Sequence, residues 1–328
     1  MAANMKAVKL RIKSVQSTMQ ITKAMELVAS SKLRRAKDRS DQCRPYFREL
    51  HQTLADIAEG NTDFSSVYAK PAAGSRSQAN RYCYVVIAGD RGLAGGYNSN
   101  LFKKLEAAAS QNLADGYNPE NRLKNSPADT GTDGSAANAG EYVVLPIGKK
   151  AVEYFQRRGV EILTEDFATV ADVSVADCFE IARLLCREYR EGRFGHIELC
   201  YTEFVSMLSQ RPQIAPMLPL TDLGSDADQT DAGNGAVSEK KTVRDLILYE
   251  PDSTEVFDAI VPEYLGGLIY GGVCDALASE LAARRNAMEA ATSNAEEMIE
   301  KLNLSYNRAR QSSITTEITE IVAGAEGV

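Results

Sequence analysis

Few side chains of this 328-residue chain are of the kinds that usually perform catalysis or bind transition metals. There are only two histidines, His51 and His196. Zinc sites built on histidine, and triads that need a histidine base, are therefore not expected. The cysteines lie far apart without a C-x-x-C pair, which predicts reduced thiols rather than a disulfide or metal framework. They are Cys43, Cys83, Cys178, Cys186, Cys200 and Cys274. The sequence accordingly predicts no catalytic residue and no metal site.

A glycine-rich turn is the one segment that could bind a phosphate group. Gly89, Gly92, Gly95 and Gly96 lie between an apolar run and a helical stretch, which is the context of a phosphate cradle. The segment has neither G-x-G-x-x-G nor the lysine and hydroxyl of a Walker site. Two interpretations stay open: a nucleotide-binding α/β enzyme that uses the turn at 89–96, or a tight connection without a ligand. The second is favoured, and no cofactor is predicted.

Two stretches show no periodic pattern and are expected to be flexible surface inserts, at 115–140 and 222–241. The second contains four aspartates, which raises the possibility of a calcium loop. They are Asp222, Asp226, Asp228 and Asp231. The stretch lacks the glutamate that closes an EF-hand loop, so calcium is not expected.

Charge is unevenly distributed along the chain. The formal net charge is −8, yet residues 6–39 contain ten basic and two acidic residues, or +8, which leaves −16 for the rest. The asymmetry indicates either a solvated helix face or an acidic partner for the basic end. A nucleic-acid-binding coiled coil would also fit a basic helix. The strongly acidic remainder and the few aromatic residues near the basic run argue against that class.

The middle of the chain, residues 80–250, alternates strand and helix patterns. Apolar runs predict strands at 82–88, 141–147, 160–163, 196–205 and 245–249. Helical patterns follow at 101–111, 149–158 and 173–191. This alternation predicts a Rossmann-like α/β domain with a mainly parallel sheet.

Long helices are predicted at both ends, over 1–60 and 255–328. Residues 1–44 contain no Gly or Pro and would span about 65 Å as a helix. Ile12, Val15, Met19 and Thr22 have the spacing of a two-helix seam, and the stripe then shifts to Ile21, Met25 and Val28. Pro45 is expected to bend or end this helix.

The C-terminal stretch between Gly272 and Gly324 is also free of Gly and Pro. Its seam positions alternate by 4 and 3, and they are Leu277, Leu281, Arg284, Met288, Ala291, Ala295, Met298, Leu302, Ser305 and Ala309. This period predicts a left-handed supercoil, with the N-terminal helix as the antiparallel partner. Because several seam residues are small or polar, the pair should need an outer sleeve. No apolar window is long enough to span a membrane, and no secretory signal is expected.

Three segments resemble the gamma subunit of F-type ATP synthases. They are Ile12–Ala36, Gly89–Asn100 and Ala276–Ala325, whose end reads I-T-x-E-x-x-E-x-x-x-G-A. The resemblance covers both ends closely and the middle in outline. Gly327 departs from the usual terminal pattern. Plastid homologues carry a regulatory cysteine pair near the second insert, but no cysteine lies between Cys200 and Cys274 here.

The resemblance implies a non-catalytic rotor subunit in the central stalk of a proton-translocating ATP synthase. In that family the terminal helices enter the hexamer of alternating alpha and beta subunits, and the α/β domain lies on the epsilon subunit and the membrane c-ring. Rotation of the ring drives the beta sites, and the subunit influences ATPase activity and proton flow. The expected location is the cytoplasmic face of a bacterial membrane, as a peripheral subunit that neither spans the bilayer nor binds nucleic acid.

The resemblance also assigns residues. Positions matched to coupling or beta contact are Lys23, Met25, Glu280, Arg284, Arg310, Gln311, Thr315, Glu317 and Glu320. An apolar tip that suits a hydrophobic bearing is formed by Ile314, Ile318, Ile321 and Val322. Arginine suits a reversible switch, because its guanidinium pairs bidentately with a carboxylate.

Overall fold

The computed structural model describes residues 2–60, 66–69, 81–114, 142–220, 250 and 252–326. The chain divides into two compact units. The first, here called the helical unit, comprises Met1–Arg34, Leu93–Gly95 and Leu281–Val328. The second, the sheet unit, comprises Arg35–Gly92 and Gly96–Glu280. The predicted inserts at 115–140 and 222–241, and the predicted strand at 245–249, lie outside the described residues.

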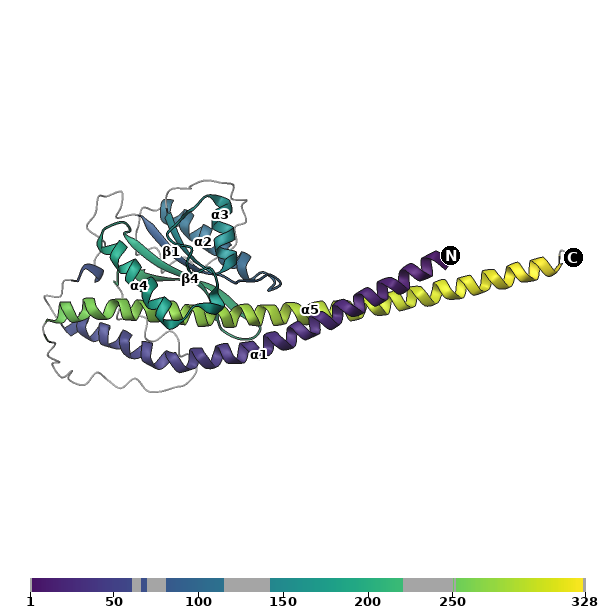
Figure 1. Cartoon of the computed structure of the whole chain (residues 1–328), viewed down its shortest axis with the longest axis horizontal. Coiled ribbons are helices and arrows are strands. Elements are labelled where there is room, and N and C mark those ends of the chain that lie inside the picture. The colour runs from purple at the N-terminus through teal and green to yellow at the C-terminus, as the bar shows by residue number, and fades with distance from the viewer. Residues whose placement is uncertain are drawn as a thin grey trace. The chain divides into compact units, whose positions relative to one another are not determined.

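A five-stranded sheet forms the centre of the sheet unit (Figure 1). Its strands are β1 (Tyr82–Ile87), β2 (Tyr142–Ile147), β3 (Glu161–Ile162), β4 (His196–Phe204) and β5 (Gln210–Leu218). They lie in the order β3-β2-β1-β4-β5. All neighbours are parallel except β4 and β5. The predicted α/β class and mainly parallel sheet are therefore confirmed.

Helices cover both faces of this sheet. The elements α2 (Tyr97–Ala114) and α3 (Lys149–Arg158) enclose one core, which includes Tyr84, Leu101, Leu105 and Phe155. The other core joins α4 (Val175–Arg190) to parts of the two terminal helices. Because successive strand residues point to opposite faces, the uninterrupted apolar run of β1 supplies both cores.

Strand β5 was not predicted. It pairs with β4 as an antiparallel edge strand and contains Pro212 and Pro216. Proline lacks a backbone donor and is tolerated on edge strands, so the local pattern does not look like that of a buried strand. The connecting turn is ordered by the hydrogen bond from the Ser206 amide to the Ser209 carbonyl, 3.0 Å.

The helix α1 runs from Ala2 to Gly60 and continues through Pro45. Of the two outcomes expected at Pro45, an end of the helix is therefore wrong, and a bend stays a prediction. Packing on the C-terminal side of this residue explains the outcome, because Leu54 and Ile57 are fully buried in the core of the sheet unit. Burial of that face outweighs the loss of one helical hydrogen bond.

The helix α5 runs from Ser253 to Glu326 and includes several glycines. At Gly266 and Gly267, an added Cβ would lie 2.2 Å from Phe179 and 2.1 Å from Phe47. These glycines therefore allow two aromatic rings to approach the helix backbone. They act as contact sites inside the helix and not as its ends.

Candidate functional site

The seam of the helical unit is continuous along α1. Buried and half-buried side chains recur at alternating spacings of 3 and 4, at Met5, Val8, Ile12, Val15, Met19, Thr22, Glu26, Ala29 and Leu33. The predicted shift toward Ile21 and Val28 is wrong, since both are exposed. The small Ala29 remains in the stripe, and small residues allow close approach of helix axes.

The seam of α5 has the predicted seven-residue period, but one of its two positions per heptad differs. Met288, Ala295, Leu302 and Ala309 are buried or half-buried as expected. Between them, the seam residues are Thr292, Ile299 and Tyr306. Of the residues predicted there, Ala291 is half-buried, whereas Met298 and Ser305 are exposed. Adjacent residues lie about 100° apart around a helix, so the partner decides which of them is buried.

The two seams meet in the helical unit, where α1 and α5 run in opposite directions (Figure 1). The hydroxyls of Thr22 and Thr292 lie 2.7 Å apart in a buried hydrogen bond. The antiparallel pairing of the two terminal helices is thus present. The left-handed supercoil stays a prediction.

The outer surface of these helices is basic and partly apolar. All ten basic residues of the N-terminal segment are exposed, and they are Lys6, Lys9, Arg11, Lys13, Lys23, Lys32, Arg34, Arg35, Lys37 and Arg39. Large apolar side chains are exposed among them, including Leu10 and Leu27. On α5, Leu304 is exposed as well. A helix that carries exposed leucines on its outer face has apolar surface available for a partner.

The coupling residues assigned by resemblance have unequal access to solvent. Lys23 is exposed, and Met25 and Arg284 are half-buried. Glu280 is only 4% exposed, and its carboxyl group lies against Gly89, where an added Cβ would be 2.8 Å from it. Glu280 therefore packs on the glycine-rich turn of its own chain.

The residues assigned near the C-terminus lie on an exposed stretch of α5. Arg310, Gln311, Thr315 and Glu317 are exposed, whereas the side chain of Glu320 lies outside the described residues. The apolar tip is exposed too, with Ile321 at 72%. Its members recur at positions that share one helix face, and they are Ile314, Ile318, Ile321 and Val322.

The glycine-rich turn is held by a carboxylate that sequence reasoning did not single out. The Asp90 carboxylate accepts hydrogen bonds from the backbone amides of Val170, 2.9 Å, Ala171, 3.2 Å, and Lys149, 3.4 Å. The Asn98 side chain accepts from the Gly89 amide at 2.9 Å. Asp90 thus caps the start of α3 and a short 3-10 turn at Val170–Asp172. Its place directly after a buried strand was the available signal.

Helix α5 occupies the point where ligands bind in open α/β sheets. In such sheets, ligands bind beyond the carboxyl ends of two neighbouring strands at which the order of the strands reverses. In this sheet the two strands are β1 and β4. An added Cβ at Gly272 would lie 3.1 Å from both Ile87 and Leu199. One helical turn further on, the Tyr97 hydroxyl donates to the Ala276 carbonyl at 3.0 Å. These contacts support an architectural role for the turn and weigh against the nucleotide-binding alternative.

Next to these contacts, a hydrogen bond also joins α5 to β4. The Ser279 hydroxyl donates to the Thr202 carbonyl at 3.0 Å. Both groups are buried, so the bond is shielded from competing water. The crevice is therefore closed by hydrogen bonds as well as by packing.

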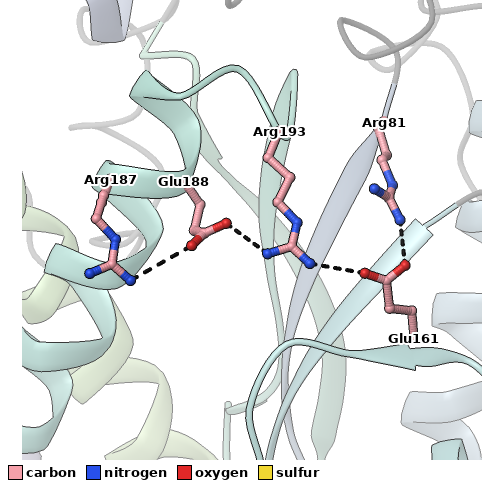
Figure 2. Close-up of polar contacts among 5 residues, drawn as sticks. All are labelled: Arg81, Glu161, Arg187, Glu188 and Arg193. Atoms are coloured by element: carbon pink, nitrogen blue, oxygen red, sulfur yellow. Dashed lines mark hydrogen bonds and ion pairs between the residues drawn. The ribbon is translucent and has the colours of Figure 1, made fainter.

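A chain of alternating charges joins α4 to the amino-terminal edge of the sheet (Figure 2). Arg193 pairs with Glu188 at 2.8 Å and with Glu161 at 2.9 Å, and Glu161 also pairs with Arg81 at 2.5 Å. Arg187 lies 3.7 Å from Glu188. Partial burial acts to raise the pKa of Glu161, but its two arginine partners outweigh this effect and the pKa is lowered. The network fixes the short strand β3 in place.

Reactive chemistry is not evident among the described cysteines. The side chains of five cysteines are buried and belong to no disulfide, and they are Cys83, Cys178, Cys186, Cys200 and Cys274. Burial raises the pKa of Cys83 and of Cys178 to about 12, so both remain protonated near neutral pH. Within the described ranges, no group of three His, Cys, Asp or Glu side chains is arranged to hold a metal ion. Nor does any helix in those ranges have the length and apolar character needed to cross a membrane.

Comparison with known proteins identifies the protein family of this chain. The family model described as ATP synthase matches residues 4–328. The ATP synthase gamma chain of Ruminococcus albus is 43% identical over 320 residues, which cover 97% of this chain and 96% of that one. The gamma chain of Acetobacterium woodii, named as sodium ion specific, is 33% identical and both chains are fully covered.

A solved structure has the same fold. It is the mitochondrial ATP synthase of Euglena gracilis, OSCP/F1/c-ring, with a TM-score of 0.57 and 17% identity. The match covers 100% of this chain and 95% of that one. Given the full-length sequence matches, the chain belongs to the family of ATP synthase gamma chains. The suspected resemblance is thereby confirmed.

Proposed function

We propose that this chain is the rotor of the central stalk of an ATP synthase, and that it transmits rotation of a membrane c-ring to catalytic beta subunits. The observation that carries the proposal is the form of the helical unit. Two oppositely directed helices share one narrow seam, while large apolar and basic side chains remain exposed around it. Membership in the gamma-chain family supports this reading. Catalysis of ATP synthesis is assigned to other subunits.

The apolar tip fits a hydrophobic bearing. Ile314, Ile318 and Ile321 are exposed aliphatic side chains without hydrogen-bonding groups. Aliphatic contacts are non-directional, so they favour no single angle strongly when one surface turns inside another. We infer that the hexamer of alpha and beta subunits surrounds this tip.

The basic helix surface fits an acidic lever on the beta subunits. Lys23 and its exposed basic neighbours would lie against that lever. Exposed ion pairs contribute only about 0–1 kcal/mol each. The torque is therefore ascribed mainly to shape, with charge setting the orientation.

The angle-dependent contacts are assigned to side chains that a partner can reach. These are Met25, Arg284, Arg310 and Gln311, with Thr315, Glu317 and Glu320 in a supporting role. Glu280 receives a different role because it is buried. We ascribe its effect on coupling to the turn at Gly89, which it contacts directly.

The sheet unit is assigned to the epsilon subunit and the c-ring. This places the chain as a peripheral subunit on the cytoplasmic face of a bacterial membrane, where it would also regulate ATPase activity and proton flow. The bacterial origin of the gamma chains from Ruminococcus albus and Acetobacterium woodii supports this location. A proton is proposed as the coupling ion, and ion-replacement assays on membranes would distinguish it from sodium.

The test is to assemble the chain with the other subunits and substitute Met25→Lys, with Met25→Leu as the volume-matched control. The added ammonium would lie two residues from Lys23, in the region proposed to face the acidic lever. We expect ATP hydrolysis to be largely retained and ion pumping per ATP to fall several-fold, while the control behaves as the wild type. Unchanged pumping in the lysine variant would overturn the Met25 assignment. Failure of the wild-type chain to co-purify with a hexameric ATPase would overturn the rotor itself.

A further inference from the structure

A second stripe of uncharged side chains runs along α1, opposite the seam that packs against α5. Two positions along a helix correspond to about 200°, so residues two positions before a seam residue point away from the seam. Leu10 stands in this relation to the seam residue Ile12, and Ser17 to Met19. We call the whole set the outer stripe. Its members follow one another at spacings of 4 and 3, and they are Leu10, Ser14, Ser17, Ile21, Ala24, Val28 and Ser31.

Every member of the outer stripe is exposed to solvent. Three of them are large aliphatic side chains, Leu10 at 62%, Ile21 at 57% and Val28 at 56%. The others are serine or alanine, whose small size lets a second helix approach α1 closely. An uncharged face that continues over three heptads is typical of a helix-packing surface, whereas a solvated face carries charged residues. The outer stripe is therefore a packing surface that the described part of the chain leaves uncovered.

The positions that flank the outer stripe are rich in basic residues. In a pair of packed helices, residues on either side of the contact form ion pairs that select the partner. The nine flanking residues are Lys6, Arg11, Lys13, Thr18, Gln20, Met25, Leu27, Lys32 and Arg34. Five of these nine are basic and none is acidic. A helix with acidic flanks would therefore be attracted, whereas a second copy of α1 would be repelled.

We propose that the outer stripe binds, along its length, an amphipathic helix of another subunit of the ATP synthase complex. Such a helix has apolar residues at spacings of 3 and 4 over about six turns, and acidic residues on both flanks. A nucleic acid fits this surface less well, because a phosphate backbone is bound by polar and charged groups and not by an apolar centre. The contact differs from the one proposed for Lys23, which lies outside the stripe. It does not require that this chain rotate.

Photochemical cross-linking in cells that express the full-length chain with the other subunits tests the proposal. The photoreactive amino acid benzoylphenylalanine replaces Ser17 or Ala24 on the stripe, or Gln16 as the exposed control outside it. After irradiation, peptide mass spectrometry locates the partner residue that is joined to each position. Ser17 and Ala24 are one heptad apart, so a helix lying along the stripe should be joined at two of its own residues about seven positions apart.

We expect these two adducts to fall on one partner segment that has acidic residues at its flanking positions. Adducts on unrelated segments would overturn the proposal. So would a greater yield from Gln16 than from the stripe, or no adduct from either stripe position. The positions of the adducts report on the stripe, whereas co-purification with a hexameric ATPase reports on the proposed rotor.

Charge reversal in the purified complex tests the acidic character of the partner helix. Lys13→Glu changes a flanking residue, and Lys9→Glu is the matched control because Lys9 is exposed but lies outside the stripe and its flanks. At low ionic strength, we expect the yield of the Ser17 adduct to fall about two- to fivefold in the first variant and to stay unchanged in the second. A fall of the same size in both variants, or in neither, would overturn the acidic assignment. Both lysines are exposed, so helical circular dichroism should be retained.

Discussion

The two units of this chain use apolar side chains in opposite ways. The sheet unit places its large residues inside, so that Tyr84, Leu105 and Phe155 are fully buried. The helical unit has one narrow seam and leaves leucines and isoleucines exposed on its outer face, with Leu304 at 60%. The sheet unit is therefore stabilised mainly by its own core. The helical unit has surface that only another molecule can cover.

The largest difference in unfolding free energy is expected between two leucine substitutions, one in each unit. Leu105→Ala removes a side chain that is 0% exposed, and we expect a loss of about 2–5 kcal/mol of unfolding free energy. Leu304→Ala, the matched control, should change it by less than about 0.5 kcal/mol. The chain contains no tryptophan, so calorimetry with circular dichroism is the suitable measurement. Equal losses would contradict the distinction between the units.

A second contrast lies between two glycines of α5. Gly266→Ala would place a Cβ 2.2 Å from Phe179, whereas the same change at Gly271 meets no atom within 4 Å. We expect Gly266→Ala to destabilise the sheet unit by about 1–3 kcal/mol through overpacking. Gly271→Ala should stabilise the helix by about 0.5–1 kcal/mol. The two variants should therefore shift the melting temperature in opposite directions, and a shift in the same direction would show that the close aromatic contact is not decisive.

Substitution of Asp90 tests whether a single carboxylate holds the backbone of the sheet unit in place. Asp90→Ala leaves the amides of Lys149, Val170 and Ala171 without their acceptor, which should cost about 1–3 kcal/mol. Hydrogen exchange at these three amides should accelerate, while amides of the helical unit keep their protection. Asp90→Asn is the conservative comparison, because its carbonyl oxygen can still accept. Unaltered exchange in the alanine variant would refute the capping role.

The smallest effect is expected at the edge of the sheet. Glu161→Gln removes the negative charge shared by Arg81 and Arg193, and the half-exposed pairs should contribute only about 0–1 kcal/mol. Because the pKa of Glu161 is lowered on folding, its stabilisation is present above the ordinary value of 4.5 and is lost as the pH falls below it. The difference between wild type and variant should therefore shrink on acidification in urea titrations. A difference that grew on acidification would reverse the assigned sign.

Much of the sheet unit could be predicted, because most of its strands are recognisable from their local sequence. β1 and β2 are uninterrupted apolar runs, β4 carries apolar residues among polar ones, and the helices between the strands show clear periodicity. β5 could not be recognised, because an edge strand with two prolines and several polar residues depends on its neighbour for its conformation. The continuation of α1 through Pro45 likewise depends on distant packing.

The functional residues were harder to predict than the fold. A seven-residue period identifies a seam, but the choice between Met298, which is exposed, and Ile299, which is half-buried, depends on which residue the partner helix presents. The burial of Glu280 depends on a turn about 190 positions earlier in the chain, at Gly89. Asp90 forms its bonds with amides of two later segments. Such contacts are set by topology, which local patterns do not contain.

The filled crevice at the carboxyl edge of the sheet has a mechanical consequence. Between Gly272 and Glu280, α5 contacts the rest of the sheet unit through close packing, two hydrogen bonds and a buried carboxyl group. The attached residues, Gly272, Ala276, Ser279 and Glu280, share one face of the helix. This stretch of α5 is consequently locked against spinning about its own axis, and turning it means turning the strands as well.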